Sequence, residues 1–321
     1  MQNLSQLSAV IEVELEKLDF PRKPEKLYQP IEYLIGLGGK RMRPILLLMA
    51  HQLFDDKIEK AISPALGIEI FHNFTLLHDD IMDQAPLRRG QQTVHEKWNK
   101  NVAILSGDTM LVQSYNFMAD VDQSIIKELL AVFNKTATQV CEGQQMDMDF
   151  ESQKEVPLQT YLKMIEYKTA VLLAASLQIG GITANASKDE QDHLYQFGIN
   201  MGIAFQLKDD LLDVFGDEAD FGKQIGGDIR SNKKTFLFLK ALQLAKDQQK
   251  KDLVSYYADE DDSEQKIMAI KKIYTDLAIQ QHTIDMMKAY YTIAMKHLDV
   301  IDSDKKQPLL DFSKKLMARI S

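Results

Sequence analysis

The segment LLHDDIMD at residues 76–83 has a counterpart in FQLKDDLLD at residues 205–213, and both lie in sequence with the periodicity of helices. Each segment contains three aspartates in the pattern D-D-x-x-D. In a helix, positions i and i+4 lie on one face, so the first and last aspartates of each cluster are expected side by side. The two segments therefore predict two helices, each of which presents a cluster of carboxylates.

Both clusters are expected to bind a cation. Three carboxylates within one helical turn repel one another, and the apolar neighbours of each cluster indicate that water is scarce there. Oxygen-only ligands select a hard ion, most commonly Mg²⁺ that bridges to a phosphate substrate. One such cluster could equally be a solvated acidic helix face, but the second copy favours metal binding and indicates a clamp on a diphosphate. The expected metal ligands are Asp79, Asp80, Asp83, Asp209 and Asp213.

The composition limits the class of protein. The 321 residues are 45% hydrophobic with 15 Gly and 8 Pro, which favours long helices in one large domain that spans residues 1–321. A net charge of −9 argues against a general nucleic-acid or anionic-membrane surface. The single cysteine, Cys141, excludes an internal disulfide framework and fits a reducing cytoplasm. We find neither a secretory signal nor a transmembrane span, so we expect a soluble cytoplasmic protein.

Helical periodicity recurs along the chain with few strand signals, which predicts an all-α protein. The expected helices lie near residues 4–18, 27–36, 42–54, 60–83, 101–120, 123–150, 158–179, 189–216, 233–246, 263–299 and 304–319. Breaks are expected at Gly38-Gly39, Ala85-Pro86, 155–157, Gly180-Gly181 and Gly226-Gly227. A charge run at 259–264 is expected to form a solvated loop.

Basic residues gather near two of these breaks. The segment GGKRMRP at 38–44 places three cations between a glycine pair and a helix start, where backbone N–H groups also favour an anion. Taken alone, this segment is more simply an exposed basic loop. Arg88 and Arg89 follow Asp83 by five and six residues, so guanidinium groups lie just beyond a predicted metal site. An acidic cluster and a basic pair at one helix end suit a metal-bound phosphate group.

These residues resemble the trans-type isoprenyl diphosphate synthases of the polyprenyl synthetase family. The similarity extends over nearly the whole chain and is carried by GGKRMRP at 38–44, LLHDDIMD at 76–83, RRG at 88–90, GD at 107–108, KT at 168–169, FQLKDDLLD at 205–213, GK at 222–223 and KKT at 233–235. It implies a single bundle of mostly antiparallel helices around a deep central cavity, usually in a homodimer. It also implies the condensation of isopentenyl diphosphate with an allylic diphosphate and three Mg²⁺ ions per active site.

The resemblance assigns roles position by position. The catalytic set comprises Asp79, Asp80, Asp83, Asp209, Asp210, Asp213, Lys168 and Lys223. Arg88, Lys168, Thr169, Gln206, Lys223 and Lys233 bind the allylic diphosphate, and Lys40, Arg43, His72 and Arg89 bind isopentenyl diphosphate. From the residues alone, His72 is more commonly a hydrogen-bonded core histidine, Lys168 a lysine at a helix edge, and Gln206 part of an interhelical hydrogen bond. The spacing from Lys223 to Lys233 is one residue longer than the usual pattern.

Product length in this family depends on residues just before the first aspartate motif. Phe74 and Thr75 lie at the fifth and fourth positions before Asp79, a pattern similar to that of short-chain enzymes. An ideal helical wheel turns Phe74 away from Asp79, so Phe71 or Thr75 equally fits the role of a floor for the growing chain. The sequence around the motif most resembles geranylgeranyl diphosphate synthases, so a twenty-carbon product is expected, with farnesyl diphosphate or a longer polyprenyl chain as the alternatives.

Three rival functions share parts of this pattern. A terpene cyclase has the first aspartate motif but usually a different second one and no second diphosphate site. A helical metal phosphohydrolase would use His78 and Asp79 on one metal, which leaves the second cluster without a role. A non-catalytic partner subunit would have no need for intact aspartates in both clusters.

Overall fold

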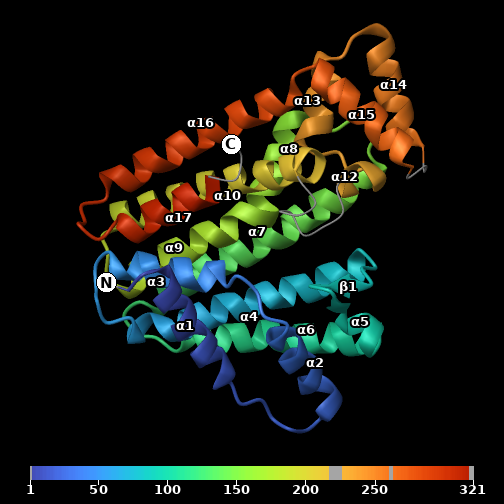
Figure 1. Cartoon of the computed structure of the whole chain (residues 1–321). Helices are drawn as coiled ribbons and strands as arrows, with labels where there is room; N and C mark the ends of the chain where they lie inside the picture. The colour runs from blue at the N-terminus through green and yellow to red at the C-terminus, as the bar shows by residue number, and fades with distance from the viewer. Residues whose placement is uncertain (1, 217–225, 260–262, 318–321) are drawn as a thin grey trace. The chain divides into compact units, whose positions relative to one another are not determined.

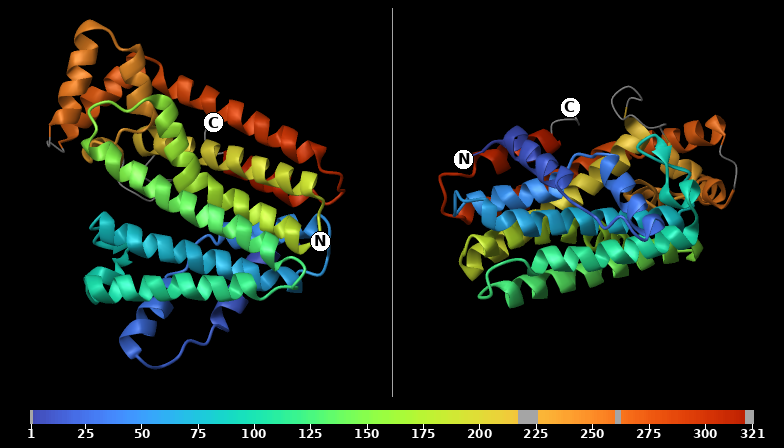
Figure 2. Two further views of the ribbon diagram at one scale, coloured as in Figure 1. Left: turned by 180° about the vertical axis from the view of Figure 1, so that it is seen from behind. Right: turned by 90° about the horizontal axis from the view of Figure 1, so that it is seen from below.

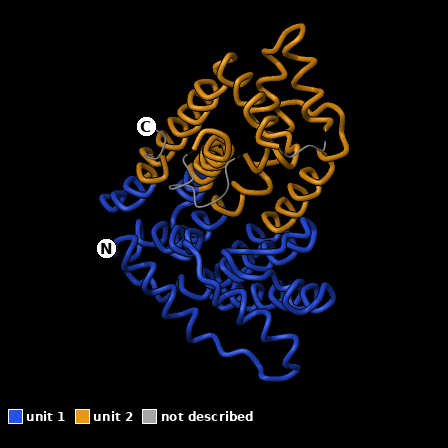
Figure 3. The backbone as a smooth tube through the Cα atoms, turned by 45° about the vertical axis from the view of Figure 1, so that its right-hand side comes forward, with its two compact units in different colours: residues 1–134, 175–194, 302–312 blue, residues 135–174, 195–301, 313–321 orange. Residues whose placement is uncertain are grey.

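The computed structural model describes residues 2–216, 226–259 and 263–317, and these residues form helices almost throughout (Figure 1). The all-α class expected from the sequence is confirmed. The chain divides into two compact units (Figure 3). Unit 1 comprises residues 1–134, 175–194 and 302–312, and unit 2 comprises residues 135–174, 195–301 and 313–321. Among the described residues, no helix combines the length and the apolar character needed to cross a bilayer.

Unit 1 contains the first aspartate motif. Its complete elements are α1 (Leu4–Glu16), α2 (Glu25–Gly36), α3 (Met42–Gln52), α4 (Glu59–Met82), β1 (Leu87–Arg88), β2 (Gln91–Gln92), α5 (Val94–Lys97) and α6 (Lys100–Ala119). The β1–β2 hairpin, which no sequence pattern had indicated, is antiparallel and follows α4 directly. Helices α4 and α6 lie side by side in both views of Figure 2.

Helix α4 is the central element of unit 1. It is buried along most of its length, and Ile68, Ile70 and Phe71 have almost no exposed surface. Gly67 permits close packing on α6, because a Cβ there would lie 3.1 Å from the Ser114 carbonyl oxygen. Burial of a continuous apolar helix fixes its position firmly. The helix therefore holds the carboxylates at its C-terminal end in a defined place.

Unit 2 contains the second aspartate motif. Its complete elements are α8 (Leu158–Ile165), a π-helical turn (Glu166–Ala170), α12 (Gly227–Arg230), α13 (Phe236–Leu244), α14 (Asp247–Ala258), α15 (Glu264–Asp276) and α16 (Ile279–Val300). Four helices contribute residues to both units, namely α7 (Ile126–Ser152), α9 (Val171–Thr183), α10 (Lys188–Phe215) and α17 (Gln307–Met317). The second aspartate motif occupies the last two turns of α10.

Several expected helix boundaries were wrong. The predicted helix 158–179 is interrupted by the π-helical turn and continues to Thr183. The predicted break at Gly180-Gly181 lies inside α9, where a Cβ on Gly180 would come within 2.2 Å of the Leu47 carbonyl oxygen. These glycines serve close helix packing within unit 1. The predicted helix 263–299 is two helices, α15 and α16, and α14 was not predicted at all.

Candidate functional site

The GGKRMRP segment turns sharply before α3. Gly38, Gly39 and Arg41 have φ values of +75°, +148° and +45°, and α3 begins at the next residue. The backbone of Gly39 also lies close to Arg89, since a Cβ at position 39 would be 2.7 Å from Nη2 of that side chain. The guanidinium of Arg89 thus lies directly against this backbone. Two parts of the chain that were predicted to bind isopentenyl diphosphate therefore meet within unit 1.

Arg43 and His72 form a partly buried pair beside this turn. Nη1 of Arg43 lies 3.0 Å from Nε2 of His72. Burial lowers the pKa of Arg43 to about 10, an effect that the Glu69 carboxylate partly opposes. Burial, followed by the charge of Arg43, holds the pKa of His72 well below 6.5. His72 is therefore neutral, and because arginine only donates, its Nε2 accepts the hydrogen bond.

The β1–β2 hairpin returns Arg88 to the first aspartate cluster. Nε and Nη2 of Arg88 each donate to a different oxygen of Asp80 over 2.7 Å, and Nη2 lies 3.8 Å from Asp79. Asp80 is buried, whereas Asp79 is partly exposed and Asp83 is exposed as the C-cap of α4. The central carboxylate thus pairs with protein, and the two outer carboxylates are more accessible to an added cation.

The second aspartate cluster has a similar division of roles within unit 2. Asp210 is buried and accepts hydrogen bonds from the Tyr161 hydroxyl and from Nε2 of Gln206, the latter over 3.1 Å. Burial, followed by the charge of Asp228, raises the pKa of Asp210 to about 7. Asp209 and Asp213 are partly exposed, and Asp213 also accepts from the backbone N–H of Asp228 over 3.0 Å.

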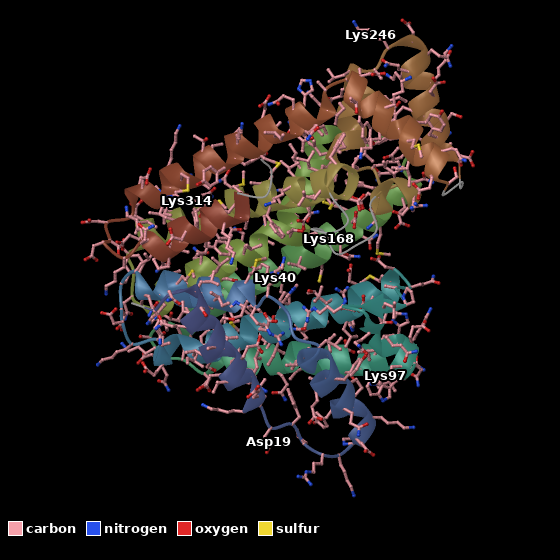
Figure 4. The ribbon with its side chains drawn as sticks, in the orientation of Figure 1. Asp19, Lys40, Lys97, Lys168, Lys246 and Lys314 are labelled. Carbon is pink, nitrogen blue, oxygen red and sulfur yellow. The ribbon has the colours of Figure 1, made fainter. Side chains whose placement is uncertain are left out.

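The π-helical turn presents Lys168 and Thr169. Nζ of Lys168 donates to Asp147 over 2.6 Å, and the Thr169 hydroxyl donates to Gln206 over 3.1 Å. Lys168 is labelled in Figure 4 on this turn. A π-helical turn inside an α-helical stretch is rare and often occurs at functional sites. It shifts the register of the side chains and here links the predicted K-T pair to Asp147 of α7 and to Gln206 of α10.

The carboxylates suit Mg²⁺ as one part of its coordination shell. Within the described part of the chain, no group of three His, Cys, Asp or Glu side chains is placed to hold a metal ion by itself. Mg²⁺, however, usually retains water and binds one or two carboxylates together with substrate phosphates. The partly exposed outer aspartates fit that mode of binding, and their oxygen-only chemistry selects a hard ion.

Comparison with known proteins assigns the family. The sequence model of the family described as Polyprenyl synthetase matches residues 24–277. The chain belongs to the polyprenyl synthetase family. Members of this family are trans-prenyltransferases that use Mg²⁺, isopentenyl diphosphate and allylic diphosphates. The resemblance inferred from the motifs is thereby confirmed, as is the prenyltransferase class of this chain.

Individual members of the polyprenyl synthetase family are similar over most of their length. The geranylgeranyl diphosphate synthase of Methanosarcina mazei is 38% identical over 238 residues, 74% of each chain. The geranylfarnesyl diphosphate synthase of Natronomonas pharaonis is 36% identical over 311 residues, 90% of this chain and 89% of the relative. A crystal structure of a geranylgeranyl pyrophosphate synthase superimposes with a TM-score of 0.95 at 41% identity and covers 100% of both chains.

The remaining predicted residues of this polyprenyl synthetase lie as follows. Lys40 is exposed just before α3, where Figure 4 labels it. Lys233 is exposed, whereas its neighbour Lys234 donates to the Phe150 carbonyl oxygen over 2.5 Å at the end of α7. Lys223 lies outside the described residues. The catalytic, substrate and metal roles of all these residues stay predictions.

Four further residues join these groups but were not selected from the sequence. Asp147 holds Lys168, Tyr161 donates to Asp210, and Asp228 donates through its backbone to Asp213. Glu69 pairs with Arg41 behind the basic turn. Only Glu69 had a sequence signal, as a lone carboxylate in the apolar run of α4. The others depend on contacts between distant segments that no local pattern reveals.

Proposed function

We propose that the chain elongates allylic diphosphates with isopentenyl diphosphate and releases geranylgeranyl diphosphate as its main product. One observation carries the proposal. Helix α4 bears carboxylates suited to a metal-bound diphosphate at its C-terminal end, and the basic group of Arg43, His72 and Arg89 gathers two turns earlier. A reaction of two diphosphates needs both kinds of binding group, whereas a terpene cyclase needs only the first.

The residues suggest how each step is supported. Asp79 and Asp83 of the first cluster and Asp209 and Asp213 of the second would hold Mg²⁺, three ions in all, which would supply positive charge to a departing diphosphate. Lys168 and Arg88 add cationic hydrogen-bond donors to that diphosphate, so the allylic C–O bond ionises. Arg43, Arg89 and Lys40 hold isopentenyl diphosphate so that its double bond attacks the allylic cation. The released pyrophosphate then takes the proton that completes chain extension.

An aromatic cluster in unit 1 supports a short product. The ring of Phe74 lies 5.6 Å from that of Phe71 and 4.8 Å from that of His78, and Phe71 lies 5.1 Å from Phe133. Phe71 and Phe74 lie on α4 between one and three turns before Asp79, and their rings pack against those of Phe133 and His78. We infer that they limit the chain to twenty carbons. The Natronomonas relative is named for a twenty-five-carbon product. That product, or a fifteen-carbon one, would require a different placement of these rings.

An exposed apolar face of α6 supports assembly into a homodimer. Leu105 and Val112 are 59% and 60% exposed and lie seven residues apart, hence on one face of the helix, next to Ile104. Such a row on a surface helix is typical of a protein interface. Val112→Glu should convert the dimer to monomer in analytical ultracentrifugation. The single catalytic domain over 1–321 and the cytoplasmic location stay predictions.

The decisive experiment supplies the purified chain with Mg²⁺, isopentenyl diphosphate and an allylic primer of five, ten or fifteen carbons. The expected result is condensation with each primer and a twenty-carbon end product in reverse-phase chromatography of the dephosphorylated products. Absence of condensation would refute the proposal. Cyclic hydrocarbons would indicate a cyclase, phosphate release from nucleotides a phosphohydrolase, and activity only after addition of a second chain a partner subunit.

A further inference from the structure

Arg41, which lies between the predicted ligands Lys40 and Arg43, has its side chain buried away from solvent. Its side chain is 2% exposed. Nη1 donates to Glu69 over 2.8 Å, Nη2 to the Ile35 carbonyl oxygen over 2.7 Å, and Nε to Glu12 over 3.1 Å. Every nitrogen of the guanidinium therefore bonds to protein. Arg41 has the same charge as its neighbours Lys40 and Arg43, but its guanidinium is bonded within the interior of unit 1.

Glu69 is held as firmly as Arg41. Its side chain is 3% exposed, and Nδ2 of Asn73 donates both to its carboxylate over 3.0 Å and to its backbone oxygen over 2.8 Å. Asn73 follows His72 on α4. The Glu69 carboxylate also raises the pKa values of Arg43 and Arg89 against the lowering effect of burial. One buried carboxylate thus counterbalances part of the positive charge of the whole basic group.

The backbone around Arg41 has a strained conformation that contacts with other segments must hold. Gly38, Gly39 and Arg41 all have positive φ, and a left-handed conformation costs a non-glycine residue about 1 kcal/mol or more. The hydrogen bonds of Arg41 to Glu69 on α4 and to Ile35 near the end of α2 oppose the return of this turn to a relaxed conformation. Without these bonds, the positions of Lys40 and Arg43 would change together.

We propose that Arg41 and Glu69 are a positioning pair for isopentenyl diphosphate: they lock the start of α3 onto α4 so that Lys40, Arg43 and His72 keep the geometry that the diphosphate requires. This inference rests on the proposed function. Neither residue of the pair touches the substrate. Arg41 fixes the backbone, and Glu69 reduces the repulsion among the guanidinium groups while the diphosphate is absent.

A double substitution separates positioning from stability. Loss of one partner of a buried ion pair leaves an unpaired charge and is strongly destabilising, whereas replacement of both partners by apolar residues of similar volume is often neutral. Arg41→Met with Glu69→Leu removes both buried charges but leaves the Ile35 carbonyl oxygen without its Arg41 donor, so in thermal melting it should be less destabilised than Arg41→Met alone. We expect this double variant to raise the KM for isopentenyl diphosphate about 10- to 100-fold, the range expected when binding groups are misplaced by about 1 Å. The KM for the allylic diphosphate should change less than about twofold.

The positioning role of Arg41 and Glu69 can be tested separately from the proposed function. The wild-type chain is assayed first, and its failure to condense the two diphosphates would refute the function itself. If the wild type is active, an unchanged KM for isopentenyl diphosphate in the double variant, or an equal rise for both substrates, overturns the positioning role. Should the double variant unfold, Glu69→Gln, which retains the shape of the side chain, is judged by the same criterion. The surface pair Lys17 and Glu14, 2.7 Å apart at the C-terminal end of α1, gives a matched control when changed to Met and Leu.

Discussion

Replacement of Gly143 should lower activity, although this residue lies outside the recognised motifs. An alanine Cβ at this position would lie 2.3 Å from the backbone nitrogen of Lys168 and 2.7 Å from the carbonyl carbon of Tyr167. Both atoms belong to the main chain, so no change of side-chain rotamer relieves the clash. The π-helical turn itself would have to move. Asp147, one turn further along α7, holds the other end of Lys168.

The size of the effect follows from this geometry. A Cβ atom essentially never approaches another heavy atom closer than 3.0 Å, so a separation of 2.3 Å requires the turn to move by about 0.7 Å. Overpacking of this kind typically costs about 1–3 kcal/mol of stability. A misplacement of about 1 Å can lower an enzyme's rate about 100-fold. Gly143→Ala should therefore remain folded but lose about 10- to 100-fold in kcat.

Steady-state kinetics with isopentenyl diphosphate and an allylic primer, together with thermal melting, test this expectation. Gly36→Ala is the matched control, because a Cβ there has nothing within 4 Å. Gly202→Ala approaches the same turn from α10, where a Cβ would lie 2.6 Å from Ala170, and should act in the same direction. A Gly143→Ala variant with wild-type kcat and melting temperature would refute the claim that this close contact positions Lys168.

Three further predictions concern the chain-length floor, the metal ligands and the response to pH. Phe74→Ala should lengthen the product in reverse-phase chromatography, and an unchanged chain length would remove Phe74 from this role. Asp79→Ala and Asp209→Ala should each lower turnover by orders of magnitude with unchanged circular dichroism, whereas Asp55→Ala, which changes a surface carboxylate paired with lysine, should not. Burial lowers the pKa of His51 below 6.5. The folded state therefore binds this proton less readily than the unfolded state, and stability is present above pH 6.5 and is lost as the pH falls below it. In urea titrations, His51→Gln should weaken that acid dependence, and an identical pH profile would contradict this assignment.

The long helices could be predicted because their signals are local. The expected helix at 60–83 corresponds to α4, Glu59–Met82, and that at 42–54 to α3, Met42–Gln52. In each, a continuous run of buried residues has few helix breakers, so periodicity alone indicates the element. The division of 263–299 at Ala278 could not be foreseen. Ala278 adopts a φ of +52°, which alanine disfavours and which only its surroundings can impose.

The π-helical turn and the Gly180-Gly181 pair show what sequence periodicity does not predict. Glycines ordinarily indicate breaks, yet Gly180 lies inside α9 because its missing side chain lets α3 approach within unit 1. Conversely, the sequence around Lys168 contains no glycine or proline, and its helix changes register because α7 and α10 press on it from two sides. Close packing between segments decides both cases, and periodicity does not report it.

In the candidate site as well, the sequence indicated the motif residues but not the partners that hold them. Asp80, Arg88 and His72 were selected from motif positions, and the structure gives each of the three a specific polar partner. Tyr161 and Asp147 were not selected, because a tyrosine or an aspartate on a helix has many ordinary explanations until its partner is known. Sequence reasoning therefore selected residues that lie within recognisable spacings. It did not recover the residues that hold them in place.

The two aspartate clusters occupy electrostatically unfavourable positions along their helices. The first lies at the C-terminal end of α4 and the second in the last two turns of α10. The helix dipole is negative at that end, so a carboxylate there is destabilised by up to about 1 kcal/mol at an exposed position. In each cluster the central aspartate, Asp80 or Asp210, is buried and neutralised or hydrogen-bonded by protein groups, while the outer aspartates remain accessible. Mg²⁺ bound by the outer aspartates, as predicted, would therefore relieve repulsion from the neighbouring carboxylates and from the helix end together.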